Sequence, residues 1–187
     1  PFILALADNL FIGKNFKSVL GQVQLTKSEA AILAVKTKYP SKSAVIEFDK
    51  KKNIKSIIEK PKNPKSNLTI PGLYFYDHQS ISVVKKLKPS KRGELEIIDL
   101  LNIYRKRNIL SADLIGRGGA WLDTGNVKDY YNASNFISAI ENRQGLKIAC
   151  LEEISYKNNW INKQDIKKSI LFYGNCDYSK YLKSLIN

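Results

Sequence analysis

Two aspartates are the first residues whose surroundings suggest chemistry. Asp123 lies in residues 116–125, a stretch that holds four of the chain's ten glycines and one tryptophan. Asp8 follows the apolar run of residues 2–7. Glycines form tight turns at little steric cost, so a glycine-rich loop can direct a carboxylate at a ligand. Two such acids, each on a turn at a strand end, would suit a divalent metal ion held between distant parts of the sequence.

The composition indicates one domain of ordinary size. The chain has 187 residues, of which 43% are hydrophobic, enough to bury one substantial core. No apolar run approaches the roughly 20 residues that a membrane-spanning helix needs, so we expect no membrane partner. The two cysteines, Cys150 and Cys176, are too few for a disulfide framework, and a reducing cytoplasm is the simplest expected location.

The net charge of +14 raises nucleic acid as an alternative partner. Only five of the 31 basic residues are arginines, however, and the lysines are scattered along the whole chain. A nucleic-acid groove more usually combines arginines with aromatic residues on one face. We therefore expect no nucleic-acid binding, and a basic surface that suits small phosphorylated anions; DNA affinity that fell steeply with salt would favour the alternative.

The apolar run at residues 2–7 is typical of an interior strand of a parallel sheet, buried on both faces. A central strand at the first residue of the sequence needs neighbouring strands from elsewhere, so we expect a further segment upstream.

Strand and helix patterns alternate through the rest of the chain. Strands are expected at 30–35, 72–76, 109–115 and 146–150, with a hairpin formed by 45–48 and 54–59 around the turn at Lys50–Lys52. Helical spacing is found at 81–87, 95–107 and 127–140, and residues 15–22 fit a short helix or a loop. This mixture predicts an α/β fold, with a sheet core at 1–125 and a mainly helical part at 126–187.

Ten short segments occur in the order that one known family shows. They are Leu6–Asn9, Val45–Asp49, Glu59–Pro61, Gly72–Asp77, Lys88–Ser90, Arg92–Ile97, Ala120–Gly125, Ala133–Ile137, Glu141–Lys147 and Glu152–Ile154. Through these segments nearly the whole chain resembles the sugar nucleotidyltransferases, most closely the glucose-1-phosphate thymidylyltransferases. One such motif would be weak support, whereas this many in register make an accidental resemblance improbable.

The resemblance implies a Rossmann-like sheet and a transferase reaction. In that reaction a nucleotidyl group passes from dTTP to glucose 1-phosphate, giving dTDP-glucose and pyrophosphate for deoxysugar and cell-surface polysaccharide biosynthesis. Two phosphate anions must meet, and like charges about 4 Å apart repel by roughly 4 kcal/mol even at an effective dielectric near 20. Cations are therefore expected around the attacked phosphorus.

The resemblance also assigns roles to individual residues. Asp8 and Asp123 would hold Mg²⁺, and Lys60 and Arg92 would grip the sugar phosphate, which is itself the nucleophile. The implied substrate-binding residues are Glu59, Ile70, Tyr74 and Trp121. A second, regulatory nucleotide site at a subunit interface is implied at Gly13, Arg117, Glu153 and Ile154. Family members are commonly tetramers, so the resemblance implies a homo-oligomer.

Simpler explanations exist for the residues taken one at a time. Asp8 could cap the turn that follows it, a common role of aspartate. Trp121 could serve core packing. Glu59 and Lys60 could form an exposed ion pair that contributes less than about 1 kcal/mol.

The chain also departs from the family pattern. The family's glycine-rich phosphate-binding segment is absent, which implies that the chain is the C-terminal portion of a single nucleotidyltransferase domain with an incomplete sheet. An upstream N-terminal fragment of roughly a hundred residues, about the length of a small domain, would then be a partner. Ala7, Ser43 and Ala44 replace residues that approach the substrates in the family. We therefore expect no turnover by this chain alone, and the alternative is a catalytically inactive relative that binds nucleotide.

Overall fold

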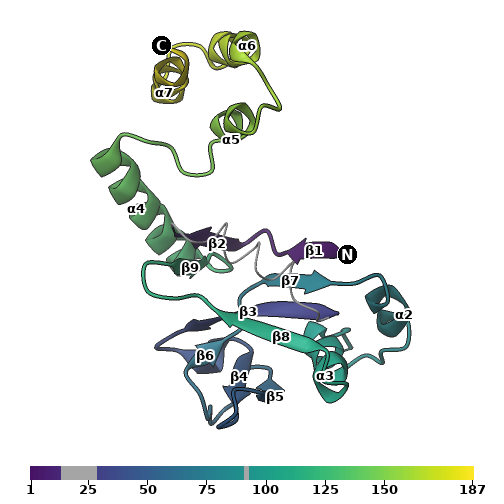
Figure 1. Cartoon of the computed structure of the whole chain (residues 1–187). Coiled ribbons are helices and arrows are strands. Elements are labelled where there is room, and N and C mark those ends of the chain that lie inside the picture. Colours follow the sequence, from purple (N-terminus) through teal and green to yellow (C-terminus); the bar gives the residue numbers. More distant parts are fainter. Residues whose placement is uncertain (14–28, 91–92) are drawn as a thin grey trace. The chain divides into compact units, whose positions relative to one another are not determined.

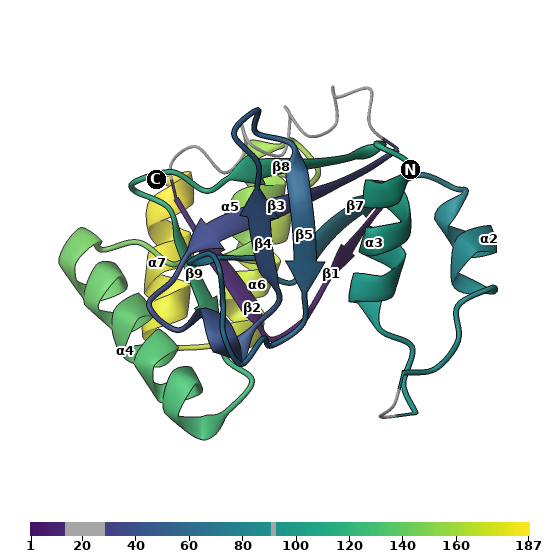
Figure 2. The same cartoon turned by 90° about the horizontal axis from the view of Figure 1, so that it is seen from below.

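The computed structural model describes residues 1–13, 29–90 and 93–187 (Figures 1 and 2). The expected helix or loop at 15–22 and Arg92 lie outside these described residues. The chain divides into two compact units, Pro1–Gly125 and Asn126–Asn187, and each is described by itself. That both units belong to a single domain stays a prediction.

The first unit is built on a mixed sheet. Its strands are β1 (Phe2–Ala5), β3 (Ala30–Lys36), β4 (Val45–Phe48), β5 (Ile54–Ile58), β6 (Leu68–Thr69), β7 (Leu73–Tyr76) and β8 (Leu110–Leu114). The strand order is β1-β7-β3-β6-β4-β5, with β8 also paired to β3. The β3–β8 pairing is parallel, whereas the pairings along the rest of the order are antiparallel. The predicted α/β class is confirmed.

The strand predicted at 30–35 is confirmed as β3, and it is the centre of the core because its continuous apolar run is buried on both faces. Ile32 lies in the cluster that also contains residues of α3 (Ile97–Lys106), including Leu101 and Tyr104. Leu33 points to the other side of the sheet and clusters with Phe75 of β7. Helix α2 (Ser80–Val84) lies next to α3 and adds Val83 to the cluster of Ile32 (Figure 1). The short 3-10 helix η1 (Pro40–Lys42) lies between β3 and β4 in the sequence. Strand β3 thus contributes side chains to the apolar clusters on both faces of the sheet.

The predicted hairpin is confirmed. β4 pairs with β5 in antiparallel register, and Asp49 closes the lysine-rich turn by accepting the amides of Lys51 and Asn53 at 2.8 Å each. Lys52 has a φ of 65°, the left-handed conformation that such turns require. The densest run of basic residues is therefore a surface turn.

Strand β1 differs from its prediction. The sequence suggested an interior strand of a parallel sheet, but β1 lies at the sheet edge and pairs antiparallel with β7. All four of its residues are exposed. The physical reason is that, within the described residues, no strand lies beyond its outer edge, so nothing there covers the apolar side chains.

The second unit consists of helices α4 (Val127–Gln144), α5 (Leu151–Lys157), α6 (Lys163–Tyr173) and α7 (Asp177–Ile186). Asn126 caps α4 by accepting the Asp129 amide, and Gly145 ends it with a φ of 67°. Cys150, Ile166 and Leu182 form the buried centre of α5, α6 and α7. Along the described part of the chain, none of the helices combines the length and the apolar character that crossing a membrane requires.

The predicted strand at 146–150 is wrong. The side chain of Glu141 captures this segment instead, since it accepts the Ile148 amide at 2.8 Å and forms an ion pair with Lys147 at 2.7 Å. Ala149 then adopts a φ of 54°, which breaks an extended path. The Glu141 carboxylate on the preceding helix, α4, therefore bends the apolar segment that was expected to form a strand.

A hydrogen-bonded carboxylate joins α5 to α7. The Tyr178 hydroxyl donates to Glu152 Oε2 at 2.5 Å and also lies 3.2 Å from the Cys150 sulfur. Burial acts to raise the pKa of Glu152, but the hydrogen bonds from Tyr178 and other donors outweigh it and hold that pKa below its ordinary value of 4.5. The ionised form of Glu152 thus stabilises the helical unit.

We expect Glu152→Gln to lower the free energy of unfolding of the helical unit by about 1 kcal/mol at neutral pH, because a charge-assisted hydrogen bond is weakened. A carboxyl group whose folded-state pKa is depressed stabilises above its unfolded-state pKa and loses that effect as the pH falls through the folded value. Denaturant unfolding followed by circular dichroism should therefore show the difference at pH 7 and little of it at pH 3. Tyr178→Phe should reproduce the loss, and equal stability of Glu152→Gln and the parent chain at pH 7 would contradict this role.

Candidate functional site

A two-stranded ribbon brings Asp8 and Asp123 together. Strand β2 (Asn9–Ile12) pairs antiparallel with β9 (Ala120–Asp123), and Asn9 lies opposite Asp123 in the register (Figure 1). Thr124 closes the end of the ribbon, because both its amide and its hydroxyl donate to the Asp8 carbonyl, at 2.8 and 2.9 Å. Residues far apart in the sequence are therefore adjacent here.

The two carboxylates converge on Gly125. A β-carbon at position 125 would lie 3.1 Å from Asp123 Oδ1 and 3.2 Å from Asp8 Oδ2. The Gly125 amide donates to Asp123 Oδ1 at 2.8 Å, and both aspartates are exposed to solvent. A side chain at this position would enter the space that the two acids face, and its β-carbon would fit only if the carboxylates shifted by a few tenths of an ångström.

Asn9 is a residue that sequence reasoning missed. Its side-chain nitrogen donates to Asp8 Oδ1 at 2.7 Å. Its side-chain oxygen accepts from the Gly72 amide at 2.9 Å and from Trp121 Nε1 at 2.6 Å. One amide therefore fixes the orientation of Asp8 and ties it to two other elements. Its position beside Asp8 was the available signal, but its partners are revealed only by the fold.

Gly72 packs directly against this turn. A β-carbon at position 72 would lie 2.8 Å from Asn9 Nδ2 and equally close to the side chain of Leu6. The Leu6 amide also donates to the Gly72 carbonyl at 2.9 Å. The turn that carries Asp8 is thus clamped onto the start of β7, the strand that contains Tyr74.

Tyr74 lies within electrostatic reach of two candidate acids. Burial is the largest cause that raises its pKa, and the negative charges of Glu59 and Asp8 add to it, so that the pKa reaches about 12. The phenol is protonated at neutral pH, as in an ordinary tyrosine, and its side chain belongs to the buried core cluster that contains Ile32.

Glu59 and Lys60 follow the end of β5. Their charged groups lie 3.7 Å apart, and 55% of the Lys60 side chain is exposed, so the ammonium group is accessible to a ligand. Lys60 has a φ of 40°, an uncommon backbone conformation for a residue other than glycine. Its amide donates to the Ser43 carbonyl at 3.3 Å, which supports that conformation.

Ile70 is held in the same part of the sheet. Its amide donates to the Ala44 carbonyl at 2.9 Å, and its side chain is buried. The backbone of Ser43 and Ala44, where the sequence departs from the family pattern, therefore positions both Lys60 and Ile70. Main-chain carbonyls make these contacts, so they do not depend on the side chains at 43 and 44.

The remaining predicted residues are distributed over both units. Trp121 is half-buried beside Asn9, and Arg92 is outside the described residues. Gly13 packs on the glycine-rich loop that carries Arg117, since a β-carbon there would lie 3.0 Å from the Gly119 α-carbon. Glu153 and Ile154 lie on α5 in the helical unit, where Glu153 accepts from the Tyr181 hydroxyl at 2.6 Å. The regulatory site and the homo-oligomer stay predictions.

The site offers two carboxylates as possible metal ligands. In the described part of the chain, no group of three or more Asp, Glu, His or Cys side chains is arranged to hold a metal ion. A pair of carboxylates suits Mg²⁺, which is commonly bound by one or two acids and completes its coordination with water and substrate phosphates. The two carboxylates therefore fit a Mg²⁺ ion that water and a phosphorylated ligand also coordinate. They fit less well a metal ion that protein side chains alone would surround.

The comparisons of this chain with known proteins all indicate one family. The nucleotidyl transferase family matches residues 1–140. The glucose-1-phosphate thymidylyltransferase of Neisseria gonorrhoeae is 42% identical over 183 residues, which are 98% of this chain and 64% of that protein. The enzyme of the same name from Mycolicibacterium smegmatis is 41% identical over 187 residues, again 98% of this chain and 64% of the relative. The chain thus spans a little under two thirds of these relatives.

A solved structure shows the same fold. It is a crystal structure from Bacillus anthracis, described as a glucose-1-phosphate thymidylyltransferase in complex with a sucrose. It is 34% identical and superposes with a TM-score of 0.64, covering 72% of this chain and 53% of the other. The predicted Rossmann-like nucleotidyltransferase fold is confirmed.

We expect Asn9→Ala to lower the free energy of unfolding of the sheet unit by about 2–3 kcal/mol, because three hydrogen bonds at a turn lose their partner. Denaturant unfolding measures this loss, and the emission spectrum of the folded variant should also change as the Trp121 indole loses its acceptor. The matched control is Asn63→Ala, in an exposed loop, which should stay within about 0.5 kcal/mol of the parent chain. Equal stability of the two variants would show that the Asn9 contacts are not maintained in solution.

Proposed function

We propose, since the chain belongs to the nucleotidyl transferase family, that it carries the metal-binding and sugar-phosphate-binding part of a glucose-1-phosphate thymidylyltransferase. The complete protein would transfer a nucleotidyl group from dTTP to glucose 1-phosphate and release pyrophosphate. Because the chain spans about 64% of its relatives, this activity is proposed for the whole protein.

The observation that carries the proposal is the convergence of Asp8 and Asp123 on the space beside Gly125. Two exposed carboxylates that face one point repel each other unless a cation lies between them or close by. We propose that they hold Mg²⁺, which when bound would supply positive charge against the repulsion between the reacting phosphates. Asn9 would keep the Asp8 carboxylate in one orientation for this role.

The second part of the proposal concerns the sugar phosphate. Lys60 presents an accessible ammonium group next to Glu59, and the family resemblance assigns Arg92 the same role of holding the sugar phosphate. These two cations would hold the phosphate of the sugar so that one of its oxygens faces the α-phosphorus of the nucleotide. A bond from that oxygen to phosphorus forms while the bond to pyrophosphate breaks. The sugar phosphate is already anionic at neutral pH, so no protein nucleophile is needed and alignment is the main contribution of the protein.

The third part is recognition of the sugar ring. Tyr74 is protonated at neutral pH, as an ordinary tyrosine is, so its hydroxyl would donate to the substrate, while the Glu59 carboxylate would accept from a sugar hydroxyl. Ile70 and Trp121 would provide apolar walls. The influence of both Glu59 and Asp8 on Tyr74 supports a sugar site that borders the metal site.

We expect no pyrophosphate when this chain alone receives glucose 1-phosphate, dTTP and Mg²⁺, because the predicted triphosphate-binding segment lies in the part that only the longer relatives contain. Pyrophosphate should appear when the unmatched third of the N. gonorrhoeae relative is joined ahead of Pro1. An enzyme-coupled pyrophosphate assay measures both reactions. Turnover by the chain alone would overturn the expectation of an incomplete site, and an inactive but folded fusion would count against the transferase function.

In the fused protein, Asp123→Ala should lower the rate by several orders of magnitude, because phosphoryl transfer depends on charge neutralisation by the metal. In the unfused chain, the same change should weaken Mn²⁺ binding by about tenfold or more, as measured by electron paramagnetic resonance. Asp99→Ala, which removes an exposed acid on α3, is the matched control and should leave both quantities unchanged. A rate loss below about tenfold would remove the metal role of Asp123.

A further inference from the structure

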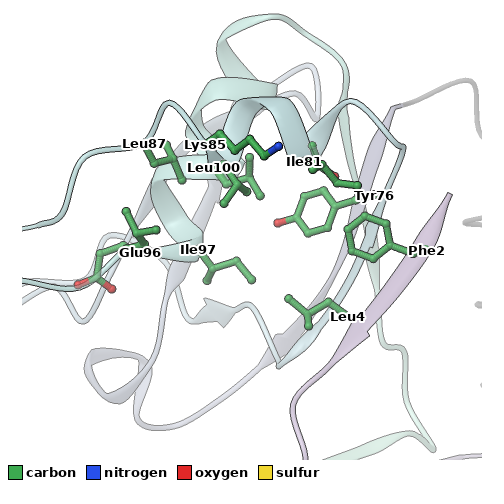
Figure 3. Close-up of a pocket in the computed structure, with 12 residues that line it drawn as sticks. Phe2, Leu4, Tyr76, Ile81, Lys85, Leu87, Glu96, Ile97 and Leu100 are labelled. Carbon is green, nitrogen blue, oxygen red and sulfur yellow. The ribbon is translucent and has the colours of Figure 1, made fainter.

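Two cavities of the sheet unit differ in the chemistry of their walls. One lies beside β1, has a volume of about 450 Å³ and is lined mainly by apolar side chains, among them Phe2, Leu4 and Leu100 (Figure 3). The other has a volume of about 270 Å³, and its wall combines cationic, amide and apolar side chains. We call this second cavity the hairpin pocket, and it is lined by Phe48, Lys52, Ile54, Arg105, Asn108 and Ala112, among others.

The hairpin pocket has two cations and no acid among the residues that line it. Lys52 is exposed at the tip of the β4–β5 hairpin, and Arg105 is half-buried in the last turn of α3. The ion pairs of the described residues include neither of them. The acid of the same turn, Asp49, does not line the pocket, and its carboxylate accepts from the amide and the side-chain nitrogen of Asn53 at 2.8 and 3.1 Å. The pocket therefore offers two positive charges that no acid in its wall neutralises.

The Arg105 guanidinium group is already held in place by the protein. Its Nε donates to Asn102 Oδ1 at 3.0 Å, and its Nη1 donates to the Lys55 carbonyl at 2.9 Å. A guanidinium group has five N–H donors in a rigid fork, so these two bonds fix its plane and leave other donors for an anion. Because the side chain is ordered in advance, little of its conformational freedom is lost when a ligand binds.

Strand β8 adds a backbone donor to the same wall. The Ala30 amide donates to the Ile109 carbonyl, and the Ile115 amide donates to the Ala34 carbonyl. Alternate residues of a strand bond to a given neighbour, so this register directs the main-chain groups of Ala112 away from β3. Within the described residues β8 pairs with β3 alone. The Ala112 amide therefore has no partner strand and can donate to a ligand in the pocket.

We propose that the hairpin pocket binds a small phosphate monoester. At neutral pH such a group carries a charge of about −1.5 to −2, which matches the two cations, and its oxygens accept from Lys52, Arg105 and the Ala112 amide. The carbon part of the ester lies against Phe48 and Ile54, whose side chains are half-buried. A volume of about 270 Å³ holds about nine waters at roughly 30 Å³ each, so the pocket suits a single ring with one phosphate.

The hairpin pocket shares no residue with the candidate site. Ile54 begins β5 at the pocket, whereas Glu59 and Lys60 follow the other end of that strand. A strand rises about 3.3 Å per residue, so the length of β5 alone separates the two places by roughly 13 Å. The hairpin pocket is therefore a second binding site, and it does not depend on the proposed function.

The test is a titration of this chain with phenyl phosphate, followed by two-dimensional proton–nitrogen NMR. The amide signals of residues 52–54, 105 and 108–112 should move. Phenyl phosphate should bind more tightly than phenyl sulfate, which carries a single negative charge, and more tightly than inorganic phosphate, which has no apolar part. Movement confined to the residues around Glu59 and Lys60 would overturn the proposal, because the probe would then occupy the candidate site.

Lys52→Gly removes one cation without straining the turn, since the φ of 65° at this position suits glycine. The affinity for phenyl phosphate should fall by about tenfold, because a charge-assisted hydrogen bond is lost. The matched control is Lys50→Ala, which removes the same charge from the same turn but lies outside the pocket wall, and it should change the affinity little. Equal affinities of the two variants would overturn the proposal, since binding would then follow only the net charge of +14.

Discussion

The pairing of β2 with β9 is the contact on which the candidate site depends. Two hydrogen bonds from Thr124 to a single carbonyl, that of Asp8, close the end of this ribbon and set the separation of the two acids. The ribbon is also linked to the main sheet, because Asn9 binds Gly72 at the start of β7. The carboxylates are therefore positioned by main-chain geometry and one amide, and not by the packing of their own side chains, which are exposed to solvent.

Electrostatics determines what such an arrangement can do. Two negative side chains that face the same point favour a cation, and a phosphorylated substrate brings further negative charge that also needs one. Burial and the negative charges of Glu59 and Asp8 raise the pKa of Tyr74 to about 12, so this side chain adds no third charge to the region. Under the proposed function, the acids would bind a metal ion, Tyr74 would donate to a sugar, and the exposed Lys60 would bind a phosphate.

The sequence predicted those elements whose pattern is local. β3 and the β4–β5 hairpin were predicted because a continuous apolar run and a lysine-rich turn specify them without help from distant residues. Strand β9 was not predicted, because the glycines around it are typical of a loop. The strand predicted at 146–150 was wrong, because the Glu141 side chain accepts the Ile148 amide and bends this segment. The exposure of β1 also could not be predicted from the sequence, because it depends on neighbouring strands, and among the described residues β1 pairs with β7 alone. The metal role of Asp8 and Asp123 was suggested by the loops that carry them and then by the family resemblance, and the role of Lys60 came from the resemblance alone. These roles stay predictions, whereas the contacts of Asn9 required the fold.

The hydrogen bonds of Asn9 determine what deamidation of its side chain would do to the site. Its oxygen accepts two donors and its nitrogen serves Asp8, so the amide has only one orientation that satisfies all three contacts. Hydrolytic deamidation of this side chain would exchange the nitrogen for an oxygen and add a negative charge 2.7 Å from the Asp8 carboxylate. The exchange of one atom would convert the group that braces Asp8 into one that repels it.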